Sequence, residues 1–294
     1  MKILLTGKNG QVGFELERTL AVLGDVTAVD VDDCNLADEA AIAALVVRVA
    51  PDVIVNPAAY TAVDNAEKNQ DLAFAINGRA PGIFGEHAKR LGALVIHFST
   101  DYVFDGSKPT PYVEPDATGP LGVYGASKLA GEQSLAASGA AHVILRTSWV
   151  VGAHGANFAK TMLRLAKERD SLNVVSDQFG APTTAALLAD VTAHLVRNRN
   201  IAAQHSGVYH CVNAGETNWC DYAKFVIGFA QRAGVALKAG PEQVNPIPSS
   251  AYPTPAKRPS NSRLDTSKFR STFGLQLPPW QDSLTHTLRQ MVTP

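Results

Sequence analysis

The chain has 294 residues, enough for one large domain or two of medium size, and 46% of them are hydrophobic. Its 26 Lys and Arg residues balance 27 Asp and Glu residues, so no basic surface for nucleic acid or an anionic membrane is expected. The three cysteines form no Cys-x-x-Cys pair and the histidines do not cluster, which predicts reduced thiols, a cytoplasmic location and no catalytic metal.

A short apolar strand, Lys2–Thr6, runs into a loop with glycines at Gly7, Gly10 and Gly13 and then into a helical pattern through about Leu23. Glycines in this context permit a tight turn and bring backbone N–H groups to a pyrophosphate at the helix N-terminus. The spacing is G-x-x-G-x-x-G instead of G-x-G-x-x-G, so a glycine turn without a ligand is the alternative. We predict a dinucleotide site here.

The second strand, Asp25–Val29, ends at Asp30, where an acidic side chain can bind the ribose hydroxyls of a dinucleotide. Asp30 disfavours a 2′-phosphate, whereas Lys8 in the glycine loop favours one, so the choice between NADH and NADPH stays open. Asp32 and Asp33 are expected in a solvated turn. Asp38 then predicts the N-cap of a helix, 39–49.

The third strand, 53–55, is followed by small residues against which a flat ligand can lie. A helical stretch, 70–91, is expected to be interrupted near Pro81, and the next strand, 94–98, ends in Ser99 and Thr100. Ligands bind at the carboxyl ends of strands in open α/β sheets, so the Thr100 hydroxyl is placed to bond a substrate oxygen. A simple turn that closes the strand is the alternative.

After a surface loop, 107–119, Tyr124 and Lys128 lie four residues apart on a helix that extends to about Ala137. That spacing puts both side chains on one helix face. An ammonium beside a phenol stabilises the phenolate, so we expect a lowered pKa for Tyr124 and a role as proton donor. By itself, the pair is also compatible with an ordinary half-exposed helix face.

The remaining chain predicts strands at 142–150, 172–175 and 207–212 and helices at 157–169, 185–196 and 219–231. A polar loop covers 177–184. Two arginines, Arg258 and Arg263, lie with Lys257 near the end, either to grip a diphosphate or as a solvated loop. We predict an α/β fold: a Rossmann-type doubly wound parallel sheet in residues 1–150, and a smaller, loop-rich substrate domain in 151–294 from which segments can return to the sheet.

The glycine loop, the Ser99–Thr100 strand end and the Tyr124/Lys128 helix together resemble the extended short-chain dehydrogenase/reductase superfamily. Within it, six segments in order resemble the dTDP-4-dehydrorhamnose reductase family: Gly7–Gly13, Asn56–Thr61, Ser99–Phe104, Arg146–Val150, Asp177–Thr183 and Arg258–Leu264. The resemblance extends from Met1 to about Leu288.

This resemblance implies reduction of the C4 ketone of dTDP-4-dehydro-L-rhamnose to dTDP-L-rhamnose, a precursor of bacterial surface polysaccharide. It implies that Tyr124 donates the proton, Lys128 binds the nicotinamide ribose and Thr100 orients the ketone, with hydride from NADPH or NADH. Implied cofactor contacts are Gly7, Asn9, Gly10, Gln11, Val12, Gly13, Asp30, Ala58, Ala59 and Tyr60. Implied sugar-nucleotide contacts are Asp101, Tyr102, Trp149, Asn157 and Arg258.

Some members of this family form a homodimer through a structural Mg²⁺ held by acidic side chains. Glu15 and Asp190 are candidates, but the tail from His286 onward contains no acid. Two other functions fit the same scaffold: an epimerase or dehydratase that keeps NAD⁺ bound, and a non-catalytic regulatory subunit. The presence of both Tyr124 and Lys128 favours catalysis.

Overall fold

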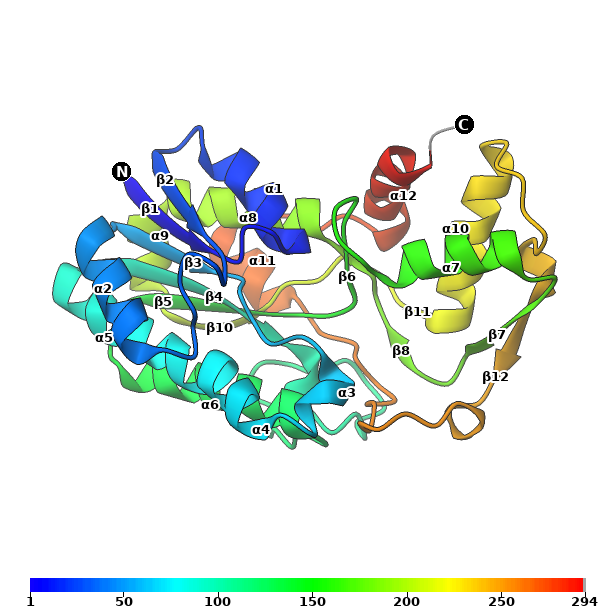
Figure 1. The fold of residues 1–294 in the computed structure, drawn as a ribbon, viewed down its shortest axis with the longest axis horizontal. Coiled ribbons are helices and arrows are strands. Elements are labelled where there is room, and N and C mark those ends of the chain that lie inside the picture. Colours follow the sequence, from blue (N-terminus) through cyan, green and yellow to red (C-terminus); the bar gives the residue numbers. More distant parts are fainter. Residues whose placement is uncertain (293–294) are drawn as a thin grey trace.

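A six-stranded parallel sheet is the centre of the fold in the computed structural model, which describes residues 1–292 (Figure 1). The strands lie in the order β10-β5-β4-β3-β1-β2. The order reverses between β1 and β3, which is where doubly wound sheets bind their ligands. The predicted Rossmann-type fold class is confirmed. The strand bounds are β1 Lys2–Thr6, β2 Asp25–Val29, β3 Val53–Asn56, β4 Leu94–Thr100, β5 His142–Thr147 and β10 Gly207–His210.

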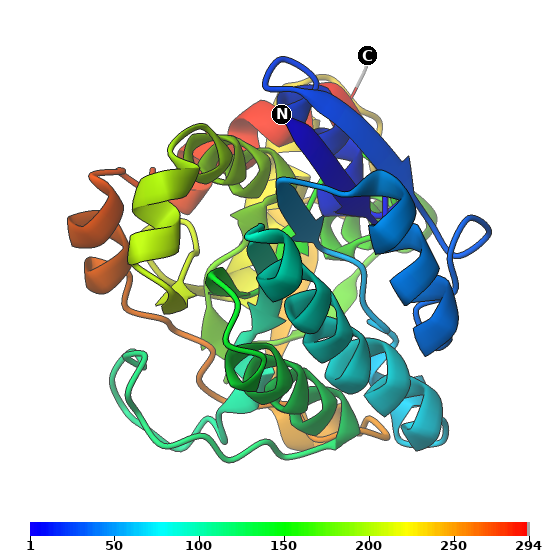
Figure 2. The ribbon, with the colours of Figure 1, turned by 90° about the vertical axis from the view of Figure 1, so that its left-hand side faces the viewer.

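Helices cover both faces of this sheet, and each face has its own apolar core. Three helices, α2 (Glu39–Val49), α5 (Ala80–Leu91) and α6 (Val123–Ala137), pack along one face. The opposite face carries α1 (Gln11–Leu20) and α8 (Ala185–Arg197), with α9 (Arg199–Gln204) and α11 (Ser267–Phe273) nearby. Figure 2 shows the sheet between these layers. The strands have nearly continuous buried residues because they are covered on both sides.

Local sequence explains several boundaries. Asp38 caps α2 as predicted, with its carboxylate accepting from the backbone N–H groups of Ala40 and Ala41. The predicted interruption near Pro81 is wrong in position. After α3 (Val63–Ala66) and α4 (Gln70–Ala73), a π-helical segment at Phe74–Arg79 forms the interruption, and Pro81 lies in the first turn of α5, directly after this segment.

The predicted strand over 142–150 is in fact two strands. Trp149 has φ +49°, a left-handed conformation that a continuous strand cannot contain, so β5 ends at Thr147 and β6 (Val150–Val151) starts after the break. β6 pairs with β9 (Thr183–Thr184) instead of continuing in the sheet. The turn leaves Trp149 at the carboxyl edge of the sheet, where the functional site lies.

A second group of elements packs beside this edge around two further apolar clusters. Its helices are α7 (Phe158–Glu168), α10 (Trp219–Arg232) and α12 (Trp280–Met291), and Figure 1 shows them to the right of the sheet. Parallel strands β7 (Leu172–Val175) and β12 (Val244–Ile247) flank them, and β8 (Phe179–Gly180) pairs with β11 (Thr217–Asn218). Residues 185–210 and α11 lie on the sheet, although they follow residue 150.

Candidate active site

The glycine loop joins β1 to α1 in a turn that only glycine fits at two positions. Gly7 has φ +64°, and a Cβ on Gly13 would lie 1.9 Å from the carbonyl oxygen of Gly7. Beside this turn is a cavity of about 450 Å³, which we call the cofactor cavity. It is lined by Gly7, Asn9, Gly10, Gln11, Val12, Gly13, Asp30, Pro57, Ala58, Ala59, Thr61, Phe98, Ser99, Tyr124, Lys128, Thr147, Val150, Gly155 and Ala156.

The cofactor cavity therefore brings together nine of the ten residues assigned to the cofactor by sequence. Tyr60 is not among the lining residues, and its backbone N–H donates to Oδ1 of Asn77. A smaller cavity of about 120 Å³ shares Gly7, Asp30 and Ala58 with the first and extends toward Cys34 and Leu36. An elongated ligand such as a dinucleotide fits two cavities joined at the end of β1 and β2.

Asp32 and Asp33 lie in an exposed turn at this end, as expected, and Asp33 is also paired with Lys8. Lys8 Nζ lies 2.7 Å from the Asp33 carboxylate, and this contact raises the pKa of Lys8 and lowers that of Asp33. The Asp30 carboxylate accepts from the backbone N–H groups of Asn9 and Val31 at 2.9 and 2.8 Å. Asp30 is therefore fixed in place at the junction of the two cavities.

A strap formed by residues 150–157 closes over the glycine loop, and no sequence motif indicated it. The Gln11 side-chain oxygen accepts from the backbone N–H of Gly152 and from the Asn157 amide, at 2.9 and 3.0 Å. His154 contacts the carbonyl of Asn9 at 3.0 Å and stacks on Phe14 with ring centroids 4.2 Å apart. Asn157, assigned by resemblance to the sugar nucleotide, thus also caps α7 and holds Gln11.

Helix α6 places both members of the Tyr124/Lys128 pair in the wall of the cofactor cavity, with Lys128 buried and Tyr124 partly buried. Lys128 is 2% exposed and donates to the backbone carbonyl of Phe98 at 2.6 Å. Burial lowers the pKa of Lys128 to about 8, although the carboxylate of Glu132 opposes the shift.

The pKa of Tyr124 shifts in the direction opposite to the expected one. Burial raises it, the nearby Asp101 carboxyl raises it further, and hydrogen bonding to Thr100 opposes both. The expectation of a lowered pKa is wrong because it considered only the ammonium and not the loss of water around the phenol. Tyr124 therefore holds its proton firmly, which is the form that a proton donor needs.

Thr100 and Asp101 adjoin the phenol at the end of β4, where the short helix η2 (Asp101–Val103) begins. The Thr100 hydroxyl donates to Asp101 Oδ1 at 3.0 Å and accepts from the backbone N–H of Tyr102 at 3.2 Å. Asp101 is 3% exposed, and burial raises its pKa to about 6. Tyr102 meets Tyr124 edge-on, with ring centroids 5.5 Å apart.

The other residues assigned to the sugar nucleotide come from distant parts of the chain. Arg258 pairs with Asp64 at 2.8 Å and acts on the pKa of Tyr102 both by charge and by hydrogen bonding. Trp149 stacks on Trp219 of α10, with ring centroids 3.8 Å apart. Trp149 thus contacts the second group of helices, and Arg258 lies near Tyr102 at the end of β4.

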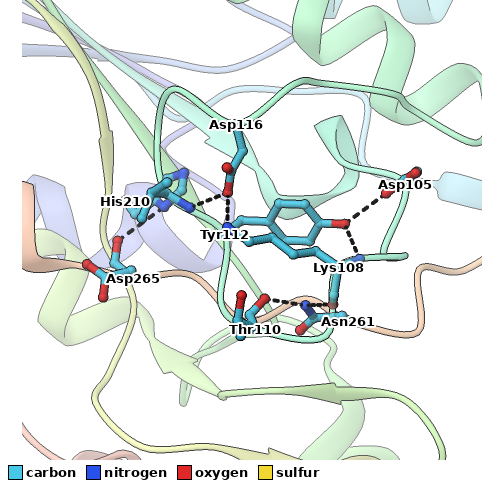
Figure 3. A network of polar contacts seen from close by, with 9 residues as sticks. Asp105, Lys108, Thr110, Tyr112, Asp116, His210, Asn261 and Asp265 are labelled. Atoms are coloured by element: carbon cyan, nitrogen blue, oxygen red, sulfur yellow. Dashed lines mark hydrogen bonds and ion pairs between the residues drawn. The ribbon is translucent and has the colours of Figure 1, made fainter.

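Two supporting networks were not predicted from sequence. Arg146 of β5 forms a bidentate pair with Glu132 of α6 at 2.8 and 2.6 Å, and both side chains are about 95% buried. In the second network, shown in Figure 3, hydrogen bonds join the loop 105–116 to residues 261–265. Asn261 donates to the carbonyls of Lys108 and Thr110, and within the loop Tyr112 donates to Asp105. These hydrogen bonds hold the segment that follows Arg258 against the loop after β4.

The structure offers no acidic cluster for the Mg²⁺ implied by resemblance. Within residues 1–292, no group of three or more His, Cys, Asp or Glu side chains is close enough together to bind a metal ion. Glu15 is paired with Arg18 instead.

Cys34, Cys211 and Cys220 are free thiols, all buried. None of the helices described is both long and apolar enough to cross a bilayer.

A parallel sheet with a glycine loop at its switch point and a tyrosine–lysine helix in the same cavity defines a Rossmann-fold enzyme of the short-chain dehydrogenase/reductase kind. Comparison with known proteins narrows the class. The model of the family described as RmlD substrate binding domain matches residues 1–293, and the chain belongs to this family.

The relatives that match over the full length include dTDP-4-dehydrorhamnose reductases. A dTDP-4-dehydrorhamnose reductase of Shigella flexneri is 51% identical, covering 100% of this chain and 99% of its own. Among solved structures, the dTDP-4-dehydrorhamnose reductase of Clostridium acetobutylicum superposes with a TM-score of 0.92 at 35% identity, covering all of both chains. The Bacillus anthracis dTDP-4-dehydrorhamnose reductase in complex with NADP gives 0.90 at 34% identity, covering 99% of this chain and 100% of that one.

Proposed function

We propose that this chain reduces the C4 ketone of dTDP-4-dehydro-L-rhamnose to dTDP-L-rhamnose with NADPH or NADH. The observation that most directly supports this proposal is that Tyr124 and Lys128 lie in one cavity with the glycine loop, in a chain similar over its full length to reductases of this description. The glycine positions fit a dinucleotide because a Cβ at Gly13 would collide with the loop that must curve around the pyrophosphate.

In this proposal the bound cofactor supplies a hydride to the ketone carbon. Tyr124 gives its proton to the oxygen of the resulting alkoxide, and the raised pKa keeps the phenol protonated until then. Thr100 is held by Asp101 and by the N–H of Tyr102, so its oxygen has a fixed place beside the phenol. Fixed donors and acceptors lower the cost of reorganising the site during the reaction.

Both cofactors are included because the residues near the adenosine end oppose each other. Asp30 repels a 2′-phosphate, and Lys8 can leave Asp33 to pair with one.

We assign the sugar nucleotide to the space beside Tyr102, Trp149 and Arg258. The second group of helices, within residues 151–294, is the proposed substrate domain. A homodimer remains a prediction, which light scattering can test.

The test is a turnover panel with both cofactors and several nucleotide 4-keto sugars. We expect Tyr124→Phe to lose about 10²–10⁴-fold in kcat, the usual contribution of a positioned proton donor. Fluorescence titration of the reduced cofactor should give the same Kd for the variant and the parent protein. Unchanged turnover in the variant would refute the assignment of Tyr124, and absence of ketone reduction in the parent protein would refute the function.

A further inference from the structure

A carboxylate in the short helix α3 joins two parts of the chain that are far apart in sequence. Oδ2 of Asp64 pairs with Nη2 of Arg258 at 2.8 Å, across 194 residues. Oδ1 of Asp64 accepts from the backbone N–H of Ala256 at 3.1 Å. Figure 1 shows the segment that contains these two partners, in orange, passing beside α3 between β12 and α11. Both oxygens of the carboxylate therefore hold one short stretch of chain, 256–258.

The part of the structure that carries Asp64 is itself attached to the catalytic helix. Glu67, directly after α3, accepts from the backbone N–H of Val123 at 2.9 Å, and Val123 is the first residue of α6. Before α3, the backbone N–H and carbonyl of Tyr60 both bond the Asn77 side-chain amide, at 2.8 and 3.1 Å. The Asp64 carboxylate thus has a fixed place relative to α6.

The segment that Asp64 holds is attached elsewhere only at some distance along the chain. On one side, the backbone N–H of Ser249 donates to the Asp177 carboxylate at 2.9 Å. On the other side, the Ser260 hydroxyl donates to the carbonyl of Gly106 at 2.8 Å. Between these attachments, residues 251–257 are mostly exposed. Asp64 is therefore the contact that fixes the middle of this span.

Arg258 still has a donor to offer while it is paired with Asp64. Within residues 1–292, its Nη1 is buried and has no hydrogen-bond partner. A buried donor without a partner costs free energy, which a bound acceptor recovers. The guanidinium also acts on Tyr102, where its charge and hydrogen bonding oppose the rise in the pKa of the phenol that burial causes. Arg258 thus offers a free donor beside the space assigned above to the sugar nucleotide.

We propose that Asp64 is a positioning residue for the sugar nucleotide, which holds Arg258 so that the guanidinium presents its free donor to a phosphate oxygen. The proposal rests on the placement of the sugar nucleotide under the proposed function. A guanidinium that is already oriented loses less side-chain freedom when it binds a phosphate. Stability alone explains the pair poorly, because the Asp64 side chain is 40% exposed and exposed ion pairs contribute little to stability.

The charge of Asp64 makes the proposal testable, because two effects of that charge on binding have opposite signs. A carboxylate near an anionic diphosphate repels it, so removal of the charge should tighten binding if Asp64 acts only through its potential. If Asp64 positions Arg258, the same change should weaken binding. Asp64 is not among the residues that line the cofactor cavity, so the cofactor should be unaffected.

The first test measures the Kd of dTDP by isothermal titration calorimetry for the parent protein and for Asp64→Asn, which keeps the shape of the side chain. We expect the Kd of dTDP to rise about tenfold in the variant, as for the loss of one charge-assisted hydrogen bond, and the Kd of NADPH to stay unchanged. An unchanged or lower Kd of dTDP in the variant would overturn the proposal. Absence of dTDP binding by the parent protein would overturn it as well.

The second test shows whether Asp64 acts through Arg258. Arg258→Met removes the guanidinium and keeps an unbranched apolar stem. In this background, Asp64→Asn should change the Kd of dTDP less than about twofold, because no guanidinium is left to orient. A tenfold rise in both backgrounds would overturn the proposal, since Asp64 would then act on binding without Arg258.

Glu216→Gln is the matched control, because it breaks an ion pair of similar exposure. Glu216 and Arg263 lie 3.0 Å apart and are 60% and 21% exposed, against 40% and 22% for Asp64 and Arg258. The Kd of dTDP should not change in this variant, and a loss equal to that in Asp64→Asn would overturn the proposal.

These titrations need no ketone, so they separate the inference from the proposed function. If dTDP binds as expected and no 4-keto sugar is reduced, the proposed function is refuted and the role of Asp64 stands. If the ketone is reduced and Asp64→Asn binds dTDP as tightly as the parent protein, only the role of Asp64 is refuted.

Discussion

Asp101 should make the protein less stable as the pH rises, which is unusual for an aspartate. Its carboxyl is 3% exposed beside Thr100, and burial raises its pKa from 3.8 to about 6. In the unfolded chain the group ionises near 3.8, whereas in the folded protein it keeps its proton until about pH 6. The unfolded state therefore binds fewer protons between these values, and the free energy of unfolding falls with rising pH.

The shift sets the size of the effect. A difference of about two pKa units corresponds to ~3 kcal/mol at 1.36 kcal/mol per unit. This penalty is absent below the unfolded pKa and complete above the folded one. Between about pH 4 and about pH 8, Asp101 should cost the protein ~2 kcal/mol in stability.

Asp101→Asn removes the titration and keeps the shape, so the assay compares urea unfolding of the variant and the parent protein across this pH range. The stability of the parent protein relative to the variant should decline as the pH rises. Asp265→Asn is the control, because the pKa of Asp265 is shifted in the opposite direction. The Asp265 carboxylate accepts from the N–H of Ser267, which lowers its pKa, so the stability of the parent protein relative to this variant should stay nearly flat between about pH 4 and about pH 8 and fall only at lower pH. A stability difference between Asp101→Asn and the parent that does not vary with pH would refute the reasoning.

Three further changes probe the cofactor cavity and its support. Lys8→Met should raise KM for NADPH several-fold and leave KM for NADH nearly unchanged, because only the first has a 2′-phosphate; equal effects in steady-state kinetics would contradict this. Glu132→Gln should cost about 3–5 kcal/mol in urea unfolding, since Arg146 is left buried with an unbalanced charge, whereas Glu168→Gln, in an exposed pair with Arg164, should cost less than about 1. Gly13→Ala should abolish cofactor binding in a fluorescence titration, and retained affinity would show that the loop can yield at the 1.9 Å contact.

Local patterns were sufficient to predict much of the sheet and its helices. The strand, glycine loop and helix at the N-terminus were predicted from residues adjacent in sequence, as was the Asp38 cap of α2. The resemblance to the dTDP-4-dehydrorhamnose reductase family is confirmed by the family match and the full-length relatives. The strand, loop, helix and cap predictions each depended on interactions within about one turn or one strand, whereas the resemblance depended on six segments in order along the chain.

What sequence did not predict depends on residues far apart in the chain. Gln11 holds the strap at Gly152 and Asn157, and Arg146 meets Glu132 only after α6 has packed on the sheet. The break at Trp149 has a similar origin, because a left-handed tryptophan is stabilised by its stacking on Trp219, not by its neighbours in sequence. No periodicity indicates such contacts.

The same distinction explains why the pKa of Tyr124 was predicted in the wrong direction. Spacing along a helix revealed a lysine near the phenol but not how deeply both would be buried. In the structure, burial moves all three ionisable groups of the site toward their neutral forms: Asp101 and Tyr124 hold protons more tightly, and Lys128 releases one more readily. These shifts reduce the cost of isolating charges from water, and the phenol keeps the proton that an alkoxide will take. Burial, more than the charge of Lys128, therefore sets the protonation of this site before substrate binds.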